Sequence, residues 1–418
     1  MRALVYPGLY RGSVKIPGSK SDAQRAILAA GLAKGRSQLE NIGISDDVRH
    51  LLAAITDLGA KVSESGNMVE IDGTVKLPNE ACVNVGESGL AFRLMCGLAA
   101  VQNGVYTIEG TGSLLSRSQS FLSEFYPNFG VDVALTNGCA PAKIHGPIEA
   151  SELLVDGSAS SQHISGMLMA LPLLSHDSVL KVGSLNSRPY VNMTLETLAK
   201  FGIDIDETQK DVFNIRGNQS YNSSNYPIEG DWSAASYWIV AAALGAKVSL
   251  EGLNMNSFQA DKTLLDVMEL VGCQIDDKGA LNIQGKAHRA FQFDATHCPD
   301  LFPALAVLAA GIVGQSSIYG TSRLAQKESD RASVLQSEMA KLGVHVELLE
   351  NEMVIHGTGV INEGAIDSHN DHRIAMCFAV AGMFADGPVV INGAEAVTKS
   401  YPEFWKDLES IAQNSSET

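Results

Sequence analysis

The segment with the clearest potential for chemistry lies near the start of the chain, where a Gly-Ser turn leads into a helix of small residues. It reads Ile16-Pro-Gly-Ser-Lys-Ser-Asp-Ala-Gln-Arg25, and the apolar stretch that follows it ends at Gly35. A turn of this kind at a helix start offers free backbone N–H groups, and Lys20 and Arg25 add positive charge. The segment can therefore bind a phosphate or a carboxylate. A capped helix with solvated charges would explain the same residues, so the motif alone leaves both interpretations open.

Two later segments also place charged side chains at expected helix starts. The first is Lys327-Glu-Ser-Asp-Arg331, which in isolation is typical of a solvated charge run. The second is His369-Asn-Asp-His-Arg373. Its histidines and Asp371, together with His297, could form a metal cluster, but a helix cap at Asn370 and Asp371 explains the pattern equally well. We therefore expect no metal here.

The overall charge restricts the partners of these segments. The chain of 418 residues has 47 acidic and 30 basic side chains, which gives a net charge of −17. A nucleic-acid partner is not expected, because such surfaces need a basic footprint. Any anionic substrate must instead be held by a local cluster of Lys and Arg side chains against an acidic background.

The composition favours a protein of the cytoplasm. The chain has no uncharged apolar run of the roughly 20 residues that a membrane-spanning helix needs. Its short apolar start is interrupted by Pro7-Gly8 and does not resemble a signal peptide. The six cysteines are scattered without a Cys-x-x-Cys pair, so we expect buried free thiols rather than disulfides or a zinc site.

The elements that must position the charged segments recur along the chain. A helix-like stretch that ends in glycine and runs into an alternating strand occurs five times, and its glycines are 71, 72, 70 and 71 residues apart. These are Gly59, Gly130, Gly202, Gly272 and Gly343. Glycine suits the position after a helix, where the backbone turns through the left-handed region. One further step reaches residues 401–411, which predict a sixth amphipathic helix.

A second helix type, rich in small apolar residues, recurs at a similar interval. Helices that are apolar on all sides should be buried. Because the chain exceeds the size of one hydrophobic core, we expect two domains, each with three units of about 70 residues. Solenoid repeats are usually shorter than these units. The predicted copies of the second helix are residues 26–35, 94–104, 167–174, 238–245, 301–314 and 374–387.

The motifs, taken in order, resemble those of the EPSP synthases, which are members of the enolpyruvyl transferase family. Pro17-Gly-Ser-Lys-Ser21 followed by Arg25 is similar to the opening signature of that family, and further matches extend to residue 402. The ordered set is far more specific than any one motif. The further matches are Ser45-Asp-Asp47, Ser160-Ser-Gln162, Ser187-Arg-Pro-Tyr190, Glu229-Gly-Asp231, His297-Cys-Pro-Asp300, Lys327-Glu-Ser-Asp-Arg331, Asn370-Asp-His-Arg373 and Thr398-Lys-Ser-Tyr-Pro402.

The resemblance implies an α/β protein with the two-domain enolpyruvyl transferase-like fold. Each domain would contain three repeats of a βαβαββ unit and form an inside-out α/β barrel. The expected domains are residues 18–228 and residues 1–17 with 229–418, and the active site is expected in the cleft between them. We expect hinges near residues 17 and 228 that let the domains close on the substrates and exclude water. A monomer without a cofactor or metal is expected.

The implied reaction joins phosphoenolpyruvate to the 5-hydroxyl of shikimate 3-phosphate by addition and elimination, with release of phosphate. Two carboxylates and two phosphates would share one cleft, so several cations are needed to offset their charge. The implied phosphoenolpyruvate site contains Lys20, Gly89, Arg117, Gln162, Arg331, Arg373 and Lys399. The implied shikimate 3-phosphate site contains Lys20, Ser21, Arg25, Ser160, Ser161, Gln162, Ser187, Tyr190, Asp300 and Lys327.

Addition and elimination require one acid and one base. Asp300 is the expected base, beside the attacking hydroxyl. Glu328 is expected beside the methylene carbon, with Lys20 as a competing acid, so the identity of the acid stays open.

The sequence departs from the family pattern at several positions and leaves two alternatives. Glu87 stands where many relatives carry a neutral amide, close to Gly89 and the pocket that glyphosate occupies in the family, and Ser116-Arg-Ser118 replaces Arg-Pro. The first alternative is the sister enzyme that acts on UDP-N-acetylglucosamine, but residues 110–118 lack the reactive cysteine usual in that loop. The second is a catalytically inactive ligand-binding relative, but the intact charged residues of the motifs argue against it.

Overall fold

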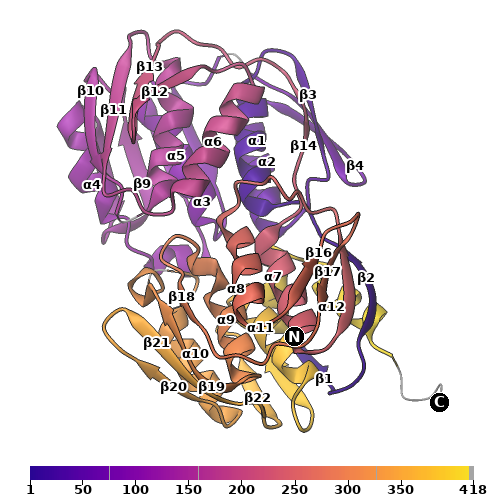
Figure 1. Ribbon diagram of the computed structural model, residues 1–418. Coiled ribbons are helices and arrows are strands. Elements are labelled where there is room, and N and C mark those ends of the chain that lie inside the picture. Colours follow the sequence, from indigo (N-terminus) through magenta and orange to yellow (C-terminus); the bar gives the residue numbers. More distant parts are fainter. Residues whose placement is uncertain (75, 159, 326, 414–418) are drawn as a thin grey trace. The chain divides into compact units, whose positions relative to one another are not determined.

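The computed structural model describes residues 1–74, 76–158, 160–325 and 327–413. The chain divides into two compact units, one formed by residues 18–228 and the other by residues 1–17 together with 229–418 (Figure 1). Among the described residues, no helix has the length and apolar character needed to cross a membrane.

The unit of residues 18–228 contains three four-stranded sheets with one common plan. In each sheet the first two strands are parallel, and the third and fourth strands are added antiparallel. The first sheet has the order β14 (Asn225–Pro227), β3 (Arg36–Glu40), β5 (Met68–Asp72) and β4 (Lys61–Ser65). The second has β6 (Glu80–Asn84), β7 (Val105–Glu109), β9 (Cys139–His145) and β8 (Asp132–Thr136). The third has β10 (Glu152–Asp156), β11 (Ser178–Gly183), β13 (Val212–Ile215) and β12 (Ile205–Gln209).

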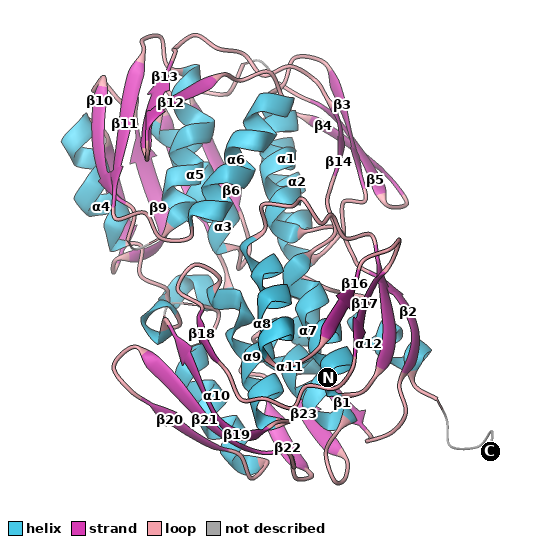
Figure 2. Ribbon diagram, in the orientation of Figure 1, coloured by secondary structure: helices cyan, strands magenta, loops and turns pink. Residues whose placement is uncertain are grey.

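In the unit of residues 18–228 most of the helices lie between the sheets, as Figure 2 shows, whereas α4 lies at the edge. The inner helices are the first helices of the three repeats, namely α1 (Lys20–Leu32), α3 (Gly89–Ala100) and α5 (Ser161–Ala170). The second helices of the repeats are α2 (Asp46–Asp57), α4 (Ser120–Phe125) and α6 (Arg188–Lys200). The inner helices approach closely because they meet at glycine: a Cβ on Gly97 would lie 2.5 Å from the backbone of Gly166.

The unit of residues 1–17 with 229–418 follows the same plan, and its last sheet has three strands. The first sheet has the order β2 (Arg11–Lys15), β15 (Lys247–Glu251), β17 (Leu281–Gln284) and β16 (Gln274–Asp276). The second has β18 (Gln292–Asp294), β19 (Val313–Tyr319), β21 (Glu352–Thr358) and β20 (His345–Leu348). The third has β22 (Gly364–Asp367), β23 (Val389–Asn392) and β1 (Arg2–Val5). The inner helices are α7 (Trp232–Leu244), α9 (Phe302–Ala310) and α11 (His372–Met383), and the second helices are α8 (Leu264–Leu270), α10 (Arg331–Lys341) and α12 (Phe404–Ile411).

Distant segments complete one repeat in the first unit and two in the second. Strand β14, at the end of residues 18–228, pairs in parallel with β3 near the start. Strands β1 and β2 pair with β23 and β15, so the first residues of the chain are built into the sheets of the C-terminal part. Indigo β1 accordingly lies among the yellow C-terminal elements in Figure 1.

The repeat predicted from the glycines is confirmed. All five glycines have a positive φ, between 76° and 109°, as expected after a helix. The small-residue helices are buried as predicted: every residue of α3, α9 and α11 lies in the interior. One predicted amphipathic helix is shorter than expected, because α4 ends at Phe125 and a 3₁₀ turn with Pro127 follows, where proline cannot donate a helical hydrogen bond.

Candidate active site

In the unit of residues 1–17 with 229–418, five charged side chains from three separate predicted motifs lie close together. Asp300 lies in a 3₁₀ turn (Pro299–Leu301) that leads into α9, Arg331 opens α10, and Arg373 is the second residue of α11. Nη1 of Arg331 donates to Oδ1 of Asp300 at 2.7 Å, and Nη2 of Arg373 donates to Oδ2 at 3.0 Å. Lys327 reaches Oδ1 at 3.3 Å, and Glu328 accepts from Nη2 of Arg331. We call these five residues the Asp300 cluster.

A buried aspartate fixes the two arginines of the Asp300 cluster. Asp371 caps α11: its Oδ1 accepts the backbone N–H of Arg373 at 2.9 Å. Its Oδ2 accepts from Nε of Arg331 at 2.8 Å. The sequence predicted the helix cap at Asp371 but not the ion pair, because Arg331 belongs to a motif 40 residues earlier.

The charges of the cluster decide the ionisation of Asp300. Burial alone would raise the pKa of this carboxyl, but Arg373, Lys327 and Arg331 outweigh it and hold the pKa well below its usual range. Burial lowers the pKa of Lys327, although Asp300 opposes that shift. Asp300 is therefore a carboxylate at neutral pH, which accepts a proton and does not supply one.

A second buried carboxyl group, that of Asp261, is subject to the electrostatic field of the Asp300 cluster. It sits in a 3₁₀ turn (Ala260–Thr263), and the hydroxyl of Ser233 donates to its Oδ2. Burial, followed by repulsion from Asp300, raises the pKa of Asp261 to about 7 against the opposing effect of Arg373. The pair therefore retains a proton on Asp261 while Asp300 stays ionised. Sequence motifs gave no signal for Asp261.

Lys399 is connected to the same loop. It ends a 3₁₀ turn (Ala394–Lys399), is buried, and donates from Nζ to the backbone oxygen of Asn370 at 2.7 Å. Asn370 precedes the cap residue Asp371, so this hydrogen bond holds Lys399 against the turn that starts α11. His369, the other neighbour of this turn, bonds to Glu338 at 2.8 Å.

In the unit of residues 18–228, the predicted Gly-Ser turn does start a helix. Ser19 caps α1 and Lys20 is its first residue. Nζ of Lys20 forms an ion pair with Asp47 at 2.9 Å, and both side chains are largely buried. Gln24, one turn further on, donates to the hydroxyl of Ser88 at 2.8 Å and so connects the starts of α1 and α3.

Arg25 is held inside this unit. Its guanidinium donates to Ser21 O at 2.6 Å, Tyr190 O at 3.1 Å and Thr194 Oγ1 at 2.8 Å, and the residue is 1% exposed. Burial lowers its pKa to about 10, which still leaves it charged at neutral pH. Arg25 therefore connects two other predicted site residues, Ser21 and Tyr190, through their backbone oxygens.

Gly89 lies against two guanidinium groups. A Cβ at this position would be 2.8 Å from Nη2 of Arg117 and 2.9 Å from Nη1 of Arg93. Arg93 also donates from Nη1 to Oε1 of Gln162 at 2.5 Å, which connects the starts of α3 and α5. Arg93 was missed as a site residue, although its spacing of four from Gly89 puts both on one face of a helix.

The unusual Glu87 points toward the next loop. Its Oε2 accepts the backbone N–H of Ser113 at 2.9 Å. Ser113 belongs to a 3₁₀ turn (Gly112–Ser116) that is followed directly by Arg117. The acidic side chain therefore supports the loop that carries Arg117.

The predicted serines gather where α5 and α6 begin. Ser160 caps α5, Ser161 is its first residue, and Ser187 immediately precedes α6. The two loops are joined because Asn186 donates to Gly157 O at 3.2 Å and to Ser158 O at 2.9 Å. Hydroxyl donors from the two helix starts of the third repeat thus come close together.

The helix caps differ between the two units. In residues 18–228 the inner helices α1, α3 and α5 all have serine caps, so the partial positive charge of these helix ends is not offset by a charged cap. In the other unit α7 and α11 are capped by Asp231 and Asp371. An anion at the first unit can use helix ends and hydroxyls, whereas one at the second depends on Arg and Lys side chains.

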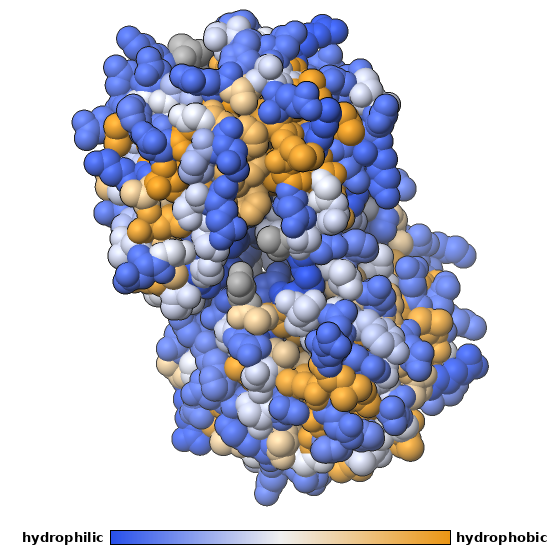
Figure 3. Space-filling model, turned by 90° about the vertical axis from the view of Figure 1, so that its left-hand side faces the viewer, coloured by the Kyte–Doolittle hydropathy of each residue, from blue (hydrophilic) through white to orange (hydrophobic). Residues whose placement is uncertain are grey.

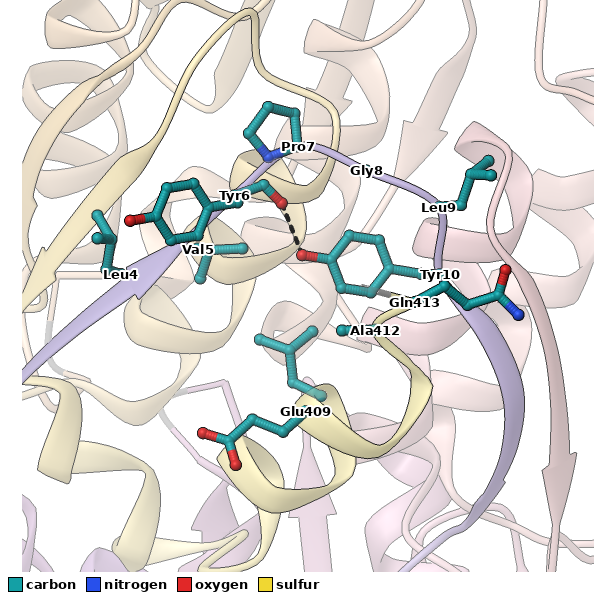
Figure 4. A pocket seen from close by; sticks show the side chains of 11 residues that line it. Leu4, Val5, Tyr6, Pro7, Gly8, Leu9, Tyr10, Glu409, Ala412 and Gln413 are labelled. Carbon is teal, nitrogen blue, oxygen red and sulfur yellow. Dashed lines mark hydrogen bonds between the residues drawn. The ribbon is translucent and has the colours of Figure 1, made fainter. Parts of the chain in front are cut away.

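A separate pocket of about 430 Å³ in the unit of residues 1–17 with 229–418 lacks such basic side chains. Figure 4 shows that aromatic and aliphatic side chains from the segment between β1 and β2 line it. The Tyr10 hydroxyl donates to the backbone oxygen of Tyr6, and the two oxygens are 2.7 Å apart. Among its described lining residues Glu409 alone is charged, so the pocket does not suit an anion. On the face drawn in Figure 3, apolar side chains form patches separated by hydrophilic ones.

The chain is similar to known proteins over nearly its whole length. The family model described as EPSP synthase (3-phosphoshikimate 1-carboxyvinyltransferase) matches residues 7–408. The chain is 35% identical over 419 residues to the 3-phosphoshikimate 1-carboxyvinyltransferase of Clostridium novyi, with 97% of this chain and 96% of the relative covered. It is also 35% identical over 413 residues to that of Clostridium kluyveri, with the same coverage of 97% and 96%. Among solved structures, an EPSP synthase from Acinetobacter baumannii is similar with a TM-score of 0.81 and 26% identity, over 98% of each chain.

Proposed function

Because the chain belongs to the EPSP synthase family, we propose that its two groups of basic residues hold the two anionic substrates of that reaction between them. The chain transfers the enolpyruvyl group of phosphoenolpyruvate to the 5-hydroxyl of shikimate 3-phosphate, which gives 5-enolpyruvylshikimate 3-phosphate and phosphate in the shikimate pathway. The two-domain α/β fold expected from the motifs is confirmed by the similarity to the solved EPSP synthase structure. The alternative activity on UDP-N-acetylglucosamine and the inactive relative are not favoured.

The observation that carries the site assignment is the Asp300 cluster. Three cationic side chains from two motifs meet one carboxylate in a chain with a net charge of −17. Lysine and arginine side chains bind carboxylates and phosphates through charge-assisted hydrogen bonds, and both substrates carry these groups.

Phosphoenolpyruvate is proposed to bind between the domains. The arginines of the Asp300 cluster and Lys399 would contact it from one domain, and the group around Gly89 from the other. Support comes from the close approach of Arg117 and Arg93 to Gly89, which places two guanidinium groups beside the start of α3. The full proposed set is Lys20, Gly89, Arg117, Gln162, Arg331, Arg373 and Lys399.

Shikimate 3-phosphate is proposed to bind mainly at the serine-capped helix ends of residues 18–228. The hydroxyls at the starts of α5 and α6 would contact its phosphate, and Asp300 and Lys327 would complete the site from the other domain. The full proposed set is Lys20, Ser21, Arg25, Ser160, Ser161, Gln162, Ser187, Tyr190, Asp300 and Lys327.

In the proposed mechanism Asp300 is the base of the addition step. It takes the proton of the 5-hydroxyl as that oxygen attacks C2 of phosphoenolpyruvate, and C3 takes a proton from Glu328 or Lys20. The tetrahedral intermediate then loses phosphate from C2 and a proton from C3, which restores the double bond. The ionised state of Asp300 supports its role as acceptor.

Closure of the two domains is part of the proposal. Its hinges would be the chain crossings between Pro17 and Gly18 and between Ile228 and Glu229, where the compact units divide. Closure would exclude water from the intermediate. Small-angle scattering with shikimate 3-phosphate plus glyphosate should show a smaller radius of gyration than the free protein, and an unchanged radius would contradict closure.

The function is tested by measuring phosphate release from phosphoenolpyruvate in the presence of shikimate 3-phosphate. Turnover is expected with this acceptor and not with UDP-N-acetylglucosamine. Turnover with UDP-N-acetylglucosamine alone would reverse the assignment.

We also propose that the enzyme acts as a cytoplasmic monomer. All six cysteines are free, which suits a reducing compartment. Light scattering coupled to size-exclusion chromatography is expected to give a mass close to 44.4 kDa, and twice that mass would contradict the monomer.

A further inference from the structure

Two histidines and a glutamate gather on the hairpin of β20 and β21, outside the proposed catalytic groups. His345 on β20 lies directly opposite His356 on β21 in the antiparallel register. Glu347 follows two residues after His345, so it projects from the same face of the sheet. The hairpin register therefore brings the three side chains to one side of two adjacent strands.

The ligand atoms of this group already have the spacing of a coordination shell. Oε1 of Glu347 lies 3.2 Å from Nε2 of His345 and 2.9 Å from Nε2 of His356, and the three ligand atoms lie within 4.8 Å of one another. With metal–ligand bonds of about 2.0–2.2 Å, neighbouring ligand atoms in a zinc site are separated by roughly 3.0–3.5 Å. Only small side-chain movements are needed to surround an ion.

The chemistry of the donors selects the kind of ion. Imidazole nitrogen suits Zn²⁺, Ni²⁺ and Cu²⁺, and a single carboxylate completes a set that Ca²⁺ and Mg²⁺ do not prefer. The three side chains are 68%, 48% and 37% exposed for His345, Glu347 and His356, so an ion reaches them directly from solvent.

We propose that His345, Glu347 and His356 form a binding site for a first-row transition-metal dication such as Zn²⁺, with water in the remaining coordination positions. The proposal rests on the geometry of the hairpin and is independent of the assigned reaction. Bound metal would join β20 to β21 and stabilise the hairpin against separation of its strands.

The test uses full-length protein without a histidine tag, treated with chelator and then dialysed. Titration calorimetry with Zn²⁺ should show one site on the wild-type protein. His356→Ala, His345→Ala and Glu347→Gln should each weaken binding by roughly tenfold or more, since even changes in the groups behind metal ligands cost that much. Their circular dichroism and metal-free melting temperatures should match the wild type, because all three side chains are at the surface.

A matched control is His145→Ala, which removes a histidine that also lies opposite a carboxylate, Asp132, on adjacent strands but has no third ligand among the described residues. It should leave Zn²⁺ binding unchanged. Co²⁺ absorption spectra distinguish the site from thiol binding at the exposed Cys82: nitrogen and oxygen ligation is expected, without the near-ultraviolet charge-transfer band of a thiolate. A thiolate band, or Zn²⁺ affinity that survives His356→Ala, would overturn the proposal.

Discussion

The guanidinium of Arg331 and the carboxylate of Asp371 form an ion pair that is completely shielded from solvent. Both side chains are 0% exposed, and Nε lies 2.8 Å from Oδ2. The same carboxylate caps α11 and accepts the backbone N–H of Arg373. One buried aspartate therefore contacts Arg331 and Arg373, two of the three arginines that we assign to phosphoenolpyruvate.

We predict that Asp371→Asn lowers kcat/KM by about ten- to hundredfold, with the larger part in KM for phosphoenolpyruvate, because small displacements of positioning groups are costly. Stability should fall by roughly 1–3 kcal/mol, since a charge-assisted hydrogen bond is weakened in the interior. Steady-state kinetics and urea denaturation measure the two effects.

Asp330→Asn is the matched control for this change. Asp330 caps the neighbouring helix α10 and bonds to Ser333, but it is exposed. Asparagine also caps helices, so near-wild-type kinetics are expected. Equal losses in both variants would mean that Asp371 acts only as a cap.

Glu328→Gln tests the acid of the proposed mechanism. Glutamine keeps the shape but cannot supply a proton, so turnover should fall by about 10²–10⁴-fold while binding of shikimate 3-phosphate is spared. Calorimetry with shikimate 3-phosphate and single-turnover kinetics separate these effects. Turnover close to normal would remove Glu328 from this role and leave Lys20, and Glu350→Gln, at an exposed loop position, is the control.

Asp261 predicts a specific dependence of stability on pH. Its pKa in the folded protein is about 7, raised from 3.8, so between these pH values the folded state holds a proton that the unfolded state has lost. The contribution of Asp261 to stability is thus fully present below about pH 4 and is lost as the pH rises through 7. Asp261→Asn keeps a bond to Ser233 without titrating, so its unfolding free energy should fall less than that of the wild type between pH 5 and about 8.

Chemical denaturation at several pH values measures this difference. Asp266→Asn, at an exposed position on α8, should follow the wild-type curve. Parallel curves for Asp261→Asn and the wild type would contradict a proton on Asp261.

The sequence predicted elements whose cause is local. A glycine such as Gly59 ends its helix because of its own backbone, and α3 is buried because all its side chains are apolar or small apart from Arg93. The contacts that complete the repeats are not local. Strand β14, near the end of residues 18–228, pairs with β3 near the start, and the three residues of β14 contain no pattern that indicates this partner. Sequence periodicity therefore predicts the repeat, but it does not predict which distant strand completes the sheet.

In the site, too, the sequence predicted residues but not the contacts between distant segments that hold them. The resemblance identified Asp300, Arg331 and Arg373, which the structure brings together, but it could not show what holds them, since Asp371 acts through a partner in another motif. Arg25 was assigned from its motif as a substrate ligand, whereas its burial against Thr194 depends on packing between α1 and α6. Its direct contact with substrate remains a prediction.

Gly89→Ala tests the group of residues 18–228 that we assign to phosphoenolpyruvate. A methyl group at this position would meet the guanidinium nitrogens of Arg117 and Arg93 at 2.8 Å and 2.9 Å, so both must shift. Because Gly89 is the first residue of α3, alanine suits the backbone there. KM for phosphoenolpyruvate should rise by about ten- to hundredfold, whereas binding of shikimate 3-phosphate alone should change little. Gly8→Ala, which adds a methyl group to open space, is the control, and an unchanged KM in Gly89→Ala would place phosphoenolpyruvate away from Arg117.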